Sequence, residues 1–130
     1  MRTAFGRRRR GYSCTYARAT GGTTMAKYLS IASYTPEGIK GLMAKGGTAR
    51  VEASRRLLAD AGGTLEGFYF ALGSDDVYIV CDLPDNVAAA ATAMSAAASG
   101  MVVNRMVALL TADEVDRAIK LRLRYDAPGS

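Results

Sequence analysis

Two acidic residues lie inside segments whose pattern is typical of β-strands, where a charge is costly unless it is exposed or paired. The alternation of side chains along a strand predicts that Glu66 shares a side with Phe68 and Phe70. The same alternation places Asp82 on the side of Tyr78. If both sides belong to the open face of one sheet, they form an acid-lined aromatic cavity that could orient a small molecule.

Such a cavity could support acid–base chemistry, with a carboxylate as the acid or base and a tyrosine as the proton donor. The candidate catalytic residues are Glu66, Asp82, Tyr69 and Tyr78. The candidate ligand-binding residues, with Arg105 as counter-ion, are Glu66, Phe68, Phe70, Tyr78, Asp82 and Arg105. The competing interpretation is structural, because ion pairs in a strand also hold charges without any function. The sequence leaves open whether the protein is an enzyme.

Several common chemistries are excluded by composition. The 130 residues include no histidine, which excludes a histidine general base, Ser-His-Asp and Cys-His catalysis, and histidine-ligated zinc or haem. The two cysteines, Cys14 and Cys81, are too few for a disulfide framework or a four-cysteine zinc site. We therefore expect no metal and no cofactor, a buried and inert Cys81, and a reducing, cytoplasmic location.

Two short motifs are interpreted as local structure. The segment from Gly41 to Thr48 resembles a phosphate-binding loop but lacks the lysine that reaches the phosphates, so it predicts a break in a helix. The adjacent Asp75 and Asp76 could bind a cation, although aspartate is also a preferred turn residue. We interpret this pair as part of a turn.

The net charge of +5 comes from the N-terminal segment. Residues 1–24 include six arginines and no acidic residue, whereas the rest of the chain has a net charge of −1. The segment has little apolar periodicity, so we expect a disordered or non-native basic extension. Its arginines could also bind the phosphates of a nucleic acid. No stretch approaches the roughly 20 apolar residues of a membrane span, so we expect no membrane partner.

The elements that must position the candidate residues alternate between strands and helices. Apolar alternation predicts strands at 27–34, 64–71, 77–83 and 102–110. Capping residues and 3.6-residue periodicity predict helices at 36–45, 48–61, 86–99 and 112–122. We expect Glu52 to pair with Arg56 and Asp116 with Lys120, since each pair is one helical turn apart. Met94 of the alanine-rich helix is expected in the core.

This order predicts an α+β fold, ferredoxin-like β-α-β-β-α-β with an extra C-terminal helix. Such a fold places its helices on one face of a four-stranded antiparallel sheet. The other face needs cover, because one side of the central hairpin is expected to present Phe68, Phe70, Tyr78 and Val80 together. The simplest cover is a second copy of the chain.

Four blocks of sequence, in this order, resemble the GYD domain family: Met25–Gly38, Gly46–Arg50, Gly63–Phe70 and Asp82–Asn86. The resemblance extends from about Met25 to Leu121. It implies a ferredoxin-like protein of the dimeric α+β barrel type, with no established activity. The Gly-Tyr-Asp signature that names the family falls near the hairpin turn, where this chain reads Gly-Ser-Asp-Asp.

Together these observations predict a GYD-like domain at 25–125 and a C-terminal coil at 126–130. The expected function is binding of a small organic ligand in a cavity on the sheet face of a homodimer or higher homo-oligomer. One alternative, implied by the barrel resemblance, is a cofactor-free enzyme of oxidase or isomerase type. The other is nucleic-acid contact through the arginine-rich N-terminal segment, although we expect no nucleic-acid partner for the folded part.

Overall fold

The computed structural model of the chain describes residues 24–129. The expectations for the N-terminal extension, including Cys14, therefore lie outside the described residues apart from Thr24. The described elements are, in chain order, β1 (Ala26–Tyr34), α2 (Pro36–Lys45), α3 (Gly47–Asp60), β2 (Thr64–Phe70), β3 (Val77–Leu83), α4 (Asn86–Ala98), β4 (Val102–Leu109) and α5 (Ala112–Ile119). This order confirms the expected alternation of strands and helices.

Side-chain caps fix where α2 and α4 begin. The Thr35 hydroxyl accepts a hydrogen bond from the Gly38 amide at 3.1 Å, and the Asp85 carboxylate accepts one from the Ala88 amide at 2.9 Å. Gly46 separates α2 from α3 with a φ of 91°, a conformation that favours glycine. The segment that resembles a phosphate-binding loop is thus a helix break, as expected.

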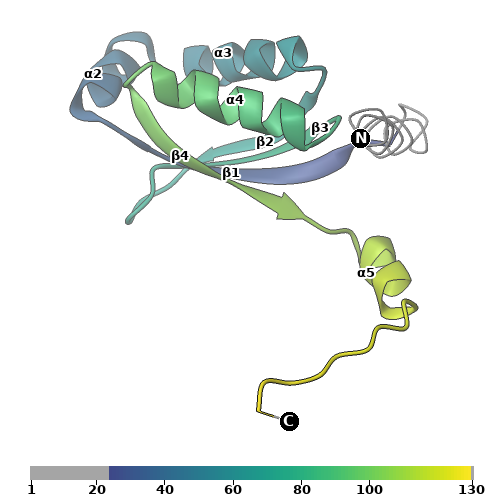
Figure 1. Cartoon of the computed structure of the whole chain (residues 1–130). Coiled ribbons are helices and arrows are strands. Elements are labelled where there is room, and N and C mark those ends of the chain that lie inside the picture. Colours follow the sequence, from purple (N-terminus) through teal and green to yellow (C-terminus); the bar gives the residue numbers. More distant parts are fainter. Residues whose placement is uncertain (1–23, 130) are drawn as a thin grey trace, which may run out of the picture.

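The four strands form one antiparallel sheet in the order β2-β3-β1-β4. Helices α2, α3 and α4 cover one face of this sheet, and no helix within residues 24–129 covers the other (Figure 1). The architecture confirms an α+β fold with a four-stranded antiparallel sheet and is consistent with a ferredoxin-like fold.

The core lies between the sheet and the helices. It is built on Tyr28 of β1, Leu58 of α3, Cys81 and Leu83 of β3, and Ala89 of α4. Full burial of a leucine side chain stabilises the fold by about 1.5–3 kcal/mol, so Leu58 and Leu83 are major contributors. The side chain of Tyr28 in β1 therefore lies on the side of the helices.

The prediction that Phe68, Phe70 and Tyr78 lie on the same side of the sheet is wrong. The register pairs Phe68 with Ile79 and Phe70 with Val77, on the face covered by the helices, whereas Tyr69 pairs with Tyr78 on the other face. The cause is an irregularity between Leu65 and Gly67, where β2 has one extra residue. This bulge reverses the alternation, so Glu66 lies on the face opposite to Phe68 and Phe70.

Four smaller expectations also differ from the structure. Met94 is 65% exposed, so it is not a core residue. Glu52 pairs with Arg55, at 3.6 Å, instead of Arg56. Helix α5 ends at Ile119, short of the expected 122, and among the described residues Lys120 does not form the expected ion pair with Asp116.

Candidate functional site

The uncovered side of the sheet, here called the open face, has an apolar centre. The strand registers place on it the side chains of Leu29, Ile31, Tyr69, Tyr78, Val80, Val103 and Val107. Tyr69 is 70% exposed and Val103 is 68% exposed. One charged cluster lies at an end of this apolar centre, and a second reaches the centre through Arg105, which is opposite Ile31 and lies between Val103 and Val107 in β4.

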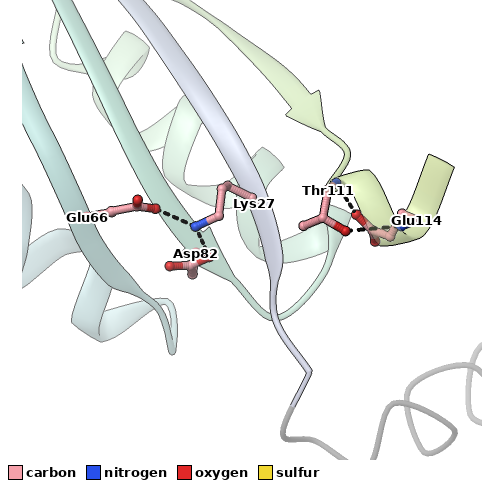
Figure 2. Close-up of polar contacts among 5 residues, drawn as sticks. All are labelled: Lys27, Glu66, Asp82, Thr111 and Glu114. Atoms are coloured by element: carbon pink, nitrogen blue, oxygen red, sulfur yellow. Dashed lines mark hydrogen bonds and ion pairs between the residues drawn. The ribbon is translucent and has the colours of Figure 1, made fainter. Parts of the chain in front are cut away.

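Lys27 organises the first cluster. It pairs directly with Asp82 across β1 and β3, and its Nζ lies 2.8 Å from Asp82 Oδ1. The same ammonium donates to Glu66, which the bulge in β2 turns toward it (Figure 2). The two candidate acids therefore do meet on one face, but they share a cation. Their arrangement is that of an ion-pair cluster between three strands, the structural interpretation that the sequence left open.

This cluster gives a first testable prediction. Hydrogen bonds to Asp82 and, secondly, to Glu66 raise the pKa of Lys27 above its ordinary 10.5. The ammonium therefore contributes stability that is complete below pH 10.5 and is lost as the pH rises through the higher pKa of the folded state. We expect Lys27→Met to lower the free energy of unfolding by about 0.5–1 kcal/mol at pH 7, because the cluster is partly exposed.

Urea denaturation from pH 7 to the alkaline range measures this effect. The difference between Lys27→Met and the unaltered chain should shrink at alkaline pH, as Lys27 loses its proton. Lys40→Met, an exposed lysine of α2, is the matched control and should show no such difference. A difference for Lys27→Met that stays constant with pH would contradict the assignment.

The second cluster lies beside the hairpin turn. Arg105 Nη2 is 3.6 Å from Asp75 Oδ2, and the Ser33 hydroxyl donates to Asp75 Oδ1 at 3.3 Å. Asp76 accepts a hydrogen bond from the Tyr34 amide at 2.8 Å and donates its own amide to the backbone of β1. These contacts confirm that both aspartates are turn residues that join the β2–β3 connection to β1.

A cavity of about 670 Å³ lies on the other side of the sheet, between the strands and helices α2, α3 and α4. We call it the helix-side cavity. Its floor is formed by the sheet side chains Ser30, Ala32, Val77, Ile79, Asn104 and Met106. Its walls are lined by small residues, among them Gly38, Gly41, Ala49, Ala53, Ala93 and Ala96. Because these side chains are short, the helices leave space above the sheet.

The rim of the helix-side cavity is mainly basic. Lys45, Arg50 and Arg56 line it together with one acid, Glu37, and all four residues are exposed. Burial raises the pKa of the Tyr34 phenol, and the nearby charge of Arg50 opposes that rise. The Tyr34 phenol therefore stays protonated at neutral pH and can donate a hydrogen bond, and the positive charge of Arg50 lies near it.

Cys81 forms part of the cavity lining, in surroundings that disfavour its reactive form. The residue is fully buried, and burial raises the pKa of its thiol to about 11. The thiolate, which is the reactive form, is therefore scarce at neutral pH. This confirms the expectation of a buried cysteine, and the raised pKa agrees with the expected low reactivity.

The structure divides the expected site residues between the two faces. Phe68 lines the helix-side cavity, and the ring of Phe70 lies beside it, with ring centroids 5.2 Å apart. The other candidates, Glu66, Tyr69, Tyr78, Asp82 and Arg105, lie on the open face. The acids and the two phenylalanines thus do not surround one cavity.

Sequence reasoning missed two features of the site. Lys27 appears at the start of a strand, where a lysine is ordinarily solvated, and only the strand register shows that it faces Asp82. The basic rim was missed because Lys45, Arg50 and Arg56 come from two helices. A possible signal was the run of glycine and alanine on α2 and α3, which are too small to fill the space above a sheet.

Comparison with known proteins gives one match. The GYD domain family matches the chain over residues 28–119, nearly the whole described fold. No curated protein matches the chain, and no solved structure does. Within residues 24–129, no helix has both the length and the apolar character needed to cross a membrane.

Proposed function

The chain belongs to the GYD domain family. From this premise we propose that it binds a small apolar acid in the helix-side cavity. We also propose that it works as a homodimer. The observation that supports binding is the cavity itself. Its volume of about 670 Å³ lies within the roughly 300–1,000 Å³ range of ligand sites. The space is partly open to solvent along its rim, so a ligand of this size could enter it.

The lining favours an apolar ligand body. Ile79, Val77 and Met106 contribute apolar surface from the sheet, and Leu57 contributes it from α3. The few polar groups inside, including Ser30 and Tyr34, can orient one polar group of a ligand. An aliphatic chain or an aromatic ring would fit this surface.

The rim favours an acidic head group. Three cationic side chains against one carboxylate give the mouth of the cavity a positive field. A carboxylate there could accept hydrogen bonds from Arg50 or Arg56, whose guanidinium groups match its geometry. We therefore propose a monocarboxylic acid with an apolar body as the ligand class.

The geometry of the helix-side cavity favours ligand binding over catalysis as its function. The acid–base candidates Glu66 and Asp82 lie on the open face and are paired with Lys27, whereas the cavity lies behind the sheet. Cys81, which does line the cavity, has a raised pKa that disfavours its reactive form. The cavity is thus better suited to hold a molecule than to transform it.

The homodimer is proposed from the open face. Its centre is a contiguous group of apolar side chains, of which Tyr69 and Val103 are mostly exposed in the single chain. Monomeric proteins rarely expose an apolar surface of this kind. The Lys27 cluster borders it at one end and Arg105 borders it along edge strand β4, as charged groups border the apolar centre of many interfaces.

Isothermal titration calorimetry with decanoate, a fatty acid that serves as the probe, tests ligand binding. We expect saturable binding by the unaltered chain. Ala53→Phe should abolish it, because the ring fills the cavity from α3. Arg50→Gln combined with Arg56→Gln should weaken it by about tenfold or more, because two charge-assisted partners are lost.

Matched controls come from the same helix. Ala59→Phe lies on the exposed side of α3, and Arg55→Gln affects an arginine that pairs with Glu52 outside the cavity lining. Both variants should bind decanoate as the unaltered chain does. Equal loss of binding in the controls, or binding by Ala53→Phe, would refute the proposed location.

A further inference from the structure

The C-terminal arm, defined as residues 112–129, extends away from the rest of the structure. Figure 1 shows α5 and the segment after it on the side of the sheet opposite to α2, α3 and α4. None of the residues of α5 is buried, and the helix makes no extensive contact with another described helix or strand. The arm therefore lies on the side of the open face.

The beginning of α5 is well specified by the sequence. The Thr111 hydroxyl accepts a hydrogen bond from the Glu114 amide at 3.1 Å, and the Glu114 carboxylate accepts one from the Thr111 amide at 2.7 Å (Figure 2). An ion pair between Asp113 and Arg117, at 3.1 Å, supports the next turn. A helix of this length is nevertheless marginal in water without a packed face.

That packed face is present but has no partner in the single chain. Val115 and Ile119, one turn apart on α5, are 42% and 69% exposed. Farther along, the side chains of Leu121, Leu123 and Tyr125 are 64%, 83% and 78% exposed. The alternation of these three with arginines is typical of an extended segment with one buried side. The arm therefore has a continuous apolar side that requires a surface to cover it.

We propose that the C-terminal arm docks on a second copy of the chain, where its apolar side covers part of the open face of the partner. The proposal rests on the homodimer proposed above and adds a contact that the sheets alone would not make. Two observations favour this occupant. The arm leaves from the end of β4, a strand that borders the open face, and it lies on the same side of the sheet as that face.

The charges of the two surfaces are complementary. Between residues 120 and 125 the arm has three basic side chains, Lys120, Arg122 and Arg124, and no acid. The Lys27 cluster on the open face has two carboxylates and one cation, and its Glu66 side chain is 55% exposed. A basic segment that crosses this end of the face would neutralise the excess carboxylate.

An anionic membrane is a less suitable partner for the apolar side of the C-terminal arm than a second copy of the chain. The first turns of α5 have three acidic residues, Asp113, Glu114 and Asp116, against one arginine. Interfacial membrane helices are instead rich in lysine and arginine on their polar face. Acidic groups next to the apolar side would repel an anionic lipid surface.

Sedimentation velocity on the full chain tests the proposal. We expect the combined Leu121→Asp and Leu123→Asp substitutions to raise the dimer dissociation constant by about tenfold or more, because two buried apolar contacts become charged. The far-ultraviolet circular dichroism spectrum should be unchanged, since both residues lie outside helices and strands. The matched control combines Met43→Asp and Val87→Asp, which are 79% and 77% exposed on the helical layer and should leave the dissociation constant unchanged.

A mixed dimer locates the contact. One copy is labelled with carbon-13 and the other is not, and isotope-filtered NMR reports only contacts between copies. We expect contacts between Leu123 or Tyr125 of one copy and Tyr78 or Val80 of the other. Contacts of the arm found only within one copy, or a dissociation constant unaffected by the arm substitutions, would overturn the proposal while leaving the dimer in place.

Two other outcomes are distinguishable. An unaltered chain that is monomeric at micromolar concentration would overturn the dimer and the arm contact together, and would leave ligand binding unaffected. Vesicles of anionic phospholipid that bind the chain, and lose this binding in the arm variant while the dimer persists, would assign the arm to a membrane and overturn the proposal.

Discussion

Replacing Gly38 by alanine is expected to destabilise the fold by about 3 kcal/mol or more. A Cβ at this position would lie 2.1 Å from the backbone oxygen of Met101 and 3.0 Å from its carbonyl carbon. Backbone atoms cannot move aside as a flexible side chain can, so α2 would have to shift away from the start of β4. That contact closes one end of the helix-side cavity, since Gly38 and Met101 both line it.

Gly41→Ala is the matched control in the same helix. Nothing lies within 4 Å of a Cβ at Gly41, and alanine is the better helix former. This variant should therefore gain about 0.5–1 kcal/mol. Thermal unfolding followed by circular dichroism distinguishes the two, with a midpoint for Gly38→Ala at least about 8 °C below that of the unaltered chain. Similar midpoints for both variants would show that α2 does not pack on β4 as described.

Placing a charge on the open face is expected to dissociate the proposed homodimer. Tyr69→Asp and Val103→Asp each put a carboxylate on a side chain that is mostly exposed in the single chain, so each should leave the folded monomer intact. In the dimer the same carboxylate would be buried without a partner. We expect the dissociation constant to rise by about a hundredfold or more, as for other buried unpaired charges at interfaces.

The control for this experiment lies on the helical layer. Val87→Asp replaces a residue that is 77% exposed near the start of α4, where an acid is compatible with the helix dipole. It should leave the dissociation constant unchanged. A dimer that survives both open-face substitutions would exclude the open face as its interface.

Much of the fold could be predicted from the sequence because its local signals agree. The caps at Thr35 and Thr111 and the break at Gly46 mark real helix boundaries. The alternation of β1 correctly separates Tyr28 from Leu29. Each of these features depends on residues a few positions apart, which a sequence displays directly.

The candidate site was predicted less well, since it depends on distant contacts. In β2 the alternation fails at Gly67, and a glycine within a strand is a recognised signal of a bulge. The cavity exists because α2, α3 and α4 present short side chains to the sheet, and the distance between the two layers is set by contacts elsewhere. The alanine-rich pattern of α4 is compatible with a closely packed helix as well as with one that leaves a cavity. It therefore led to the wrong prediction that Met94 lies in the core, whereas Met94 is 65% exposed.

The most direct test of ligand binding in the helix-side cavity is methyl NMR during the decanoate titration. Ile79 and Leu57 line this cavity, whereas Val80 and Val107 lie on the open face of the same sheet. The proposed function predicts saturable shifts of the Ile79 and Leu57 methyl resonances, with Val80 and Val107 unaffected. Shifts confined to Val80 and Val107, or no saturable shift of any methyl at millimolar decanoate, would contradict it.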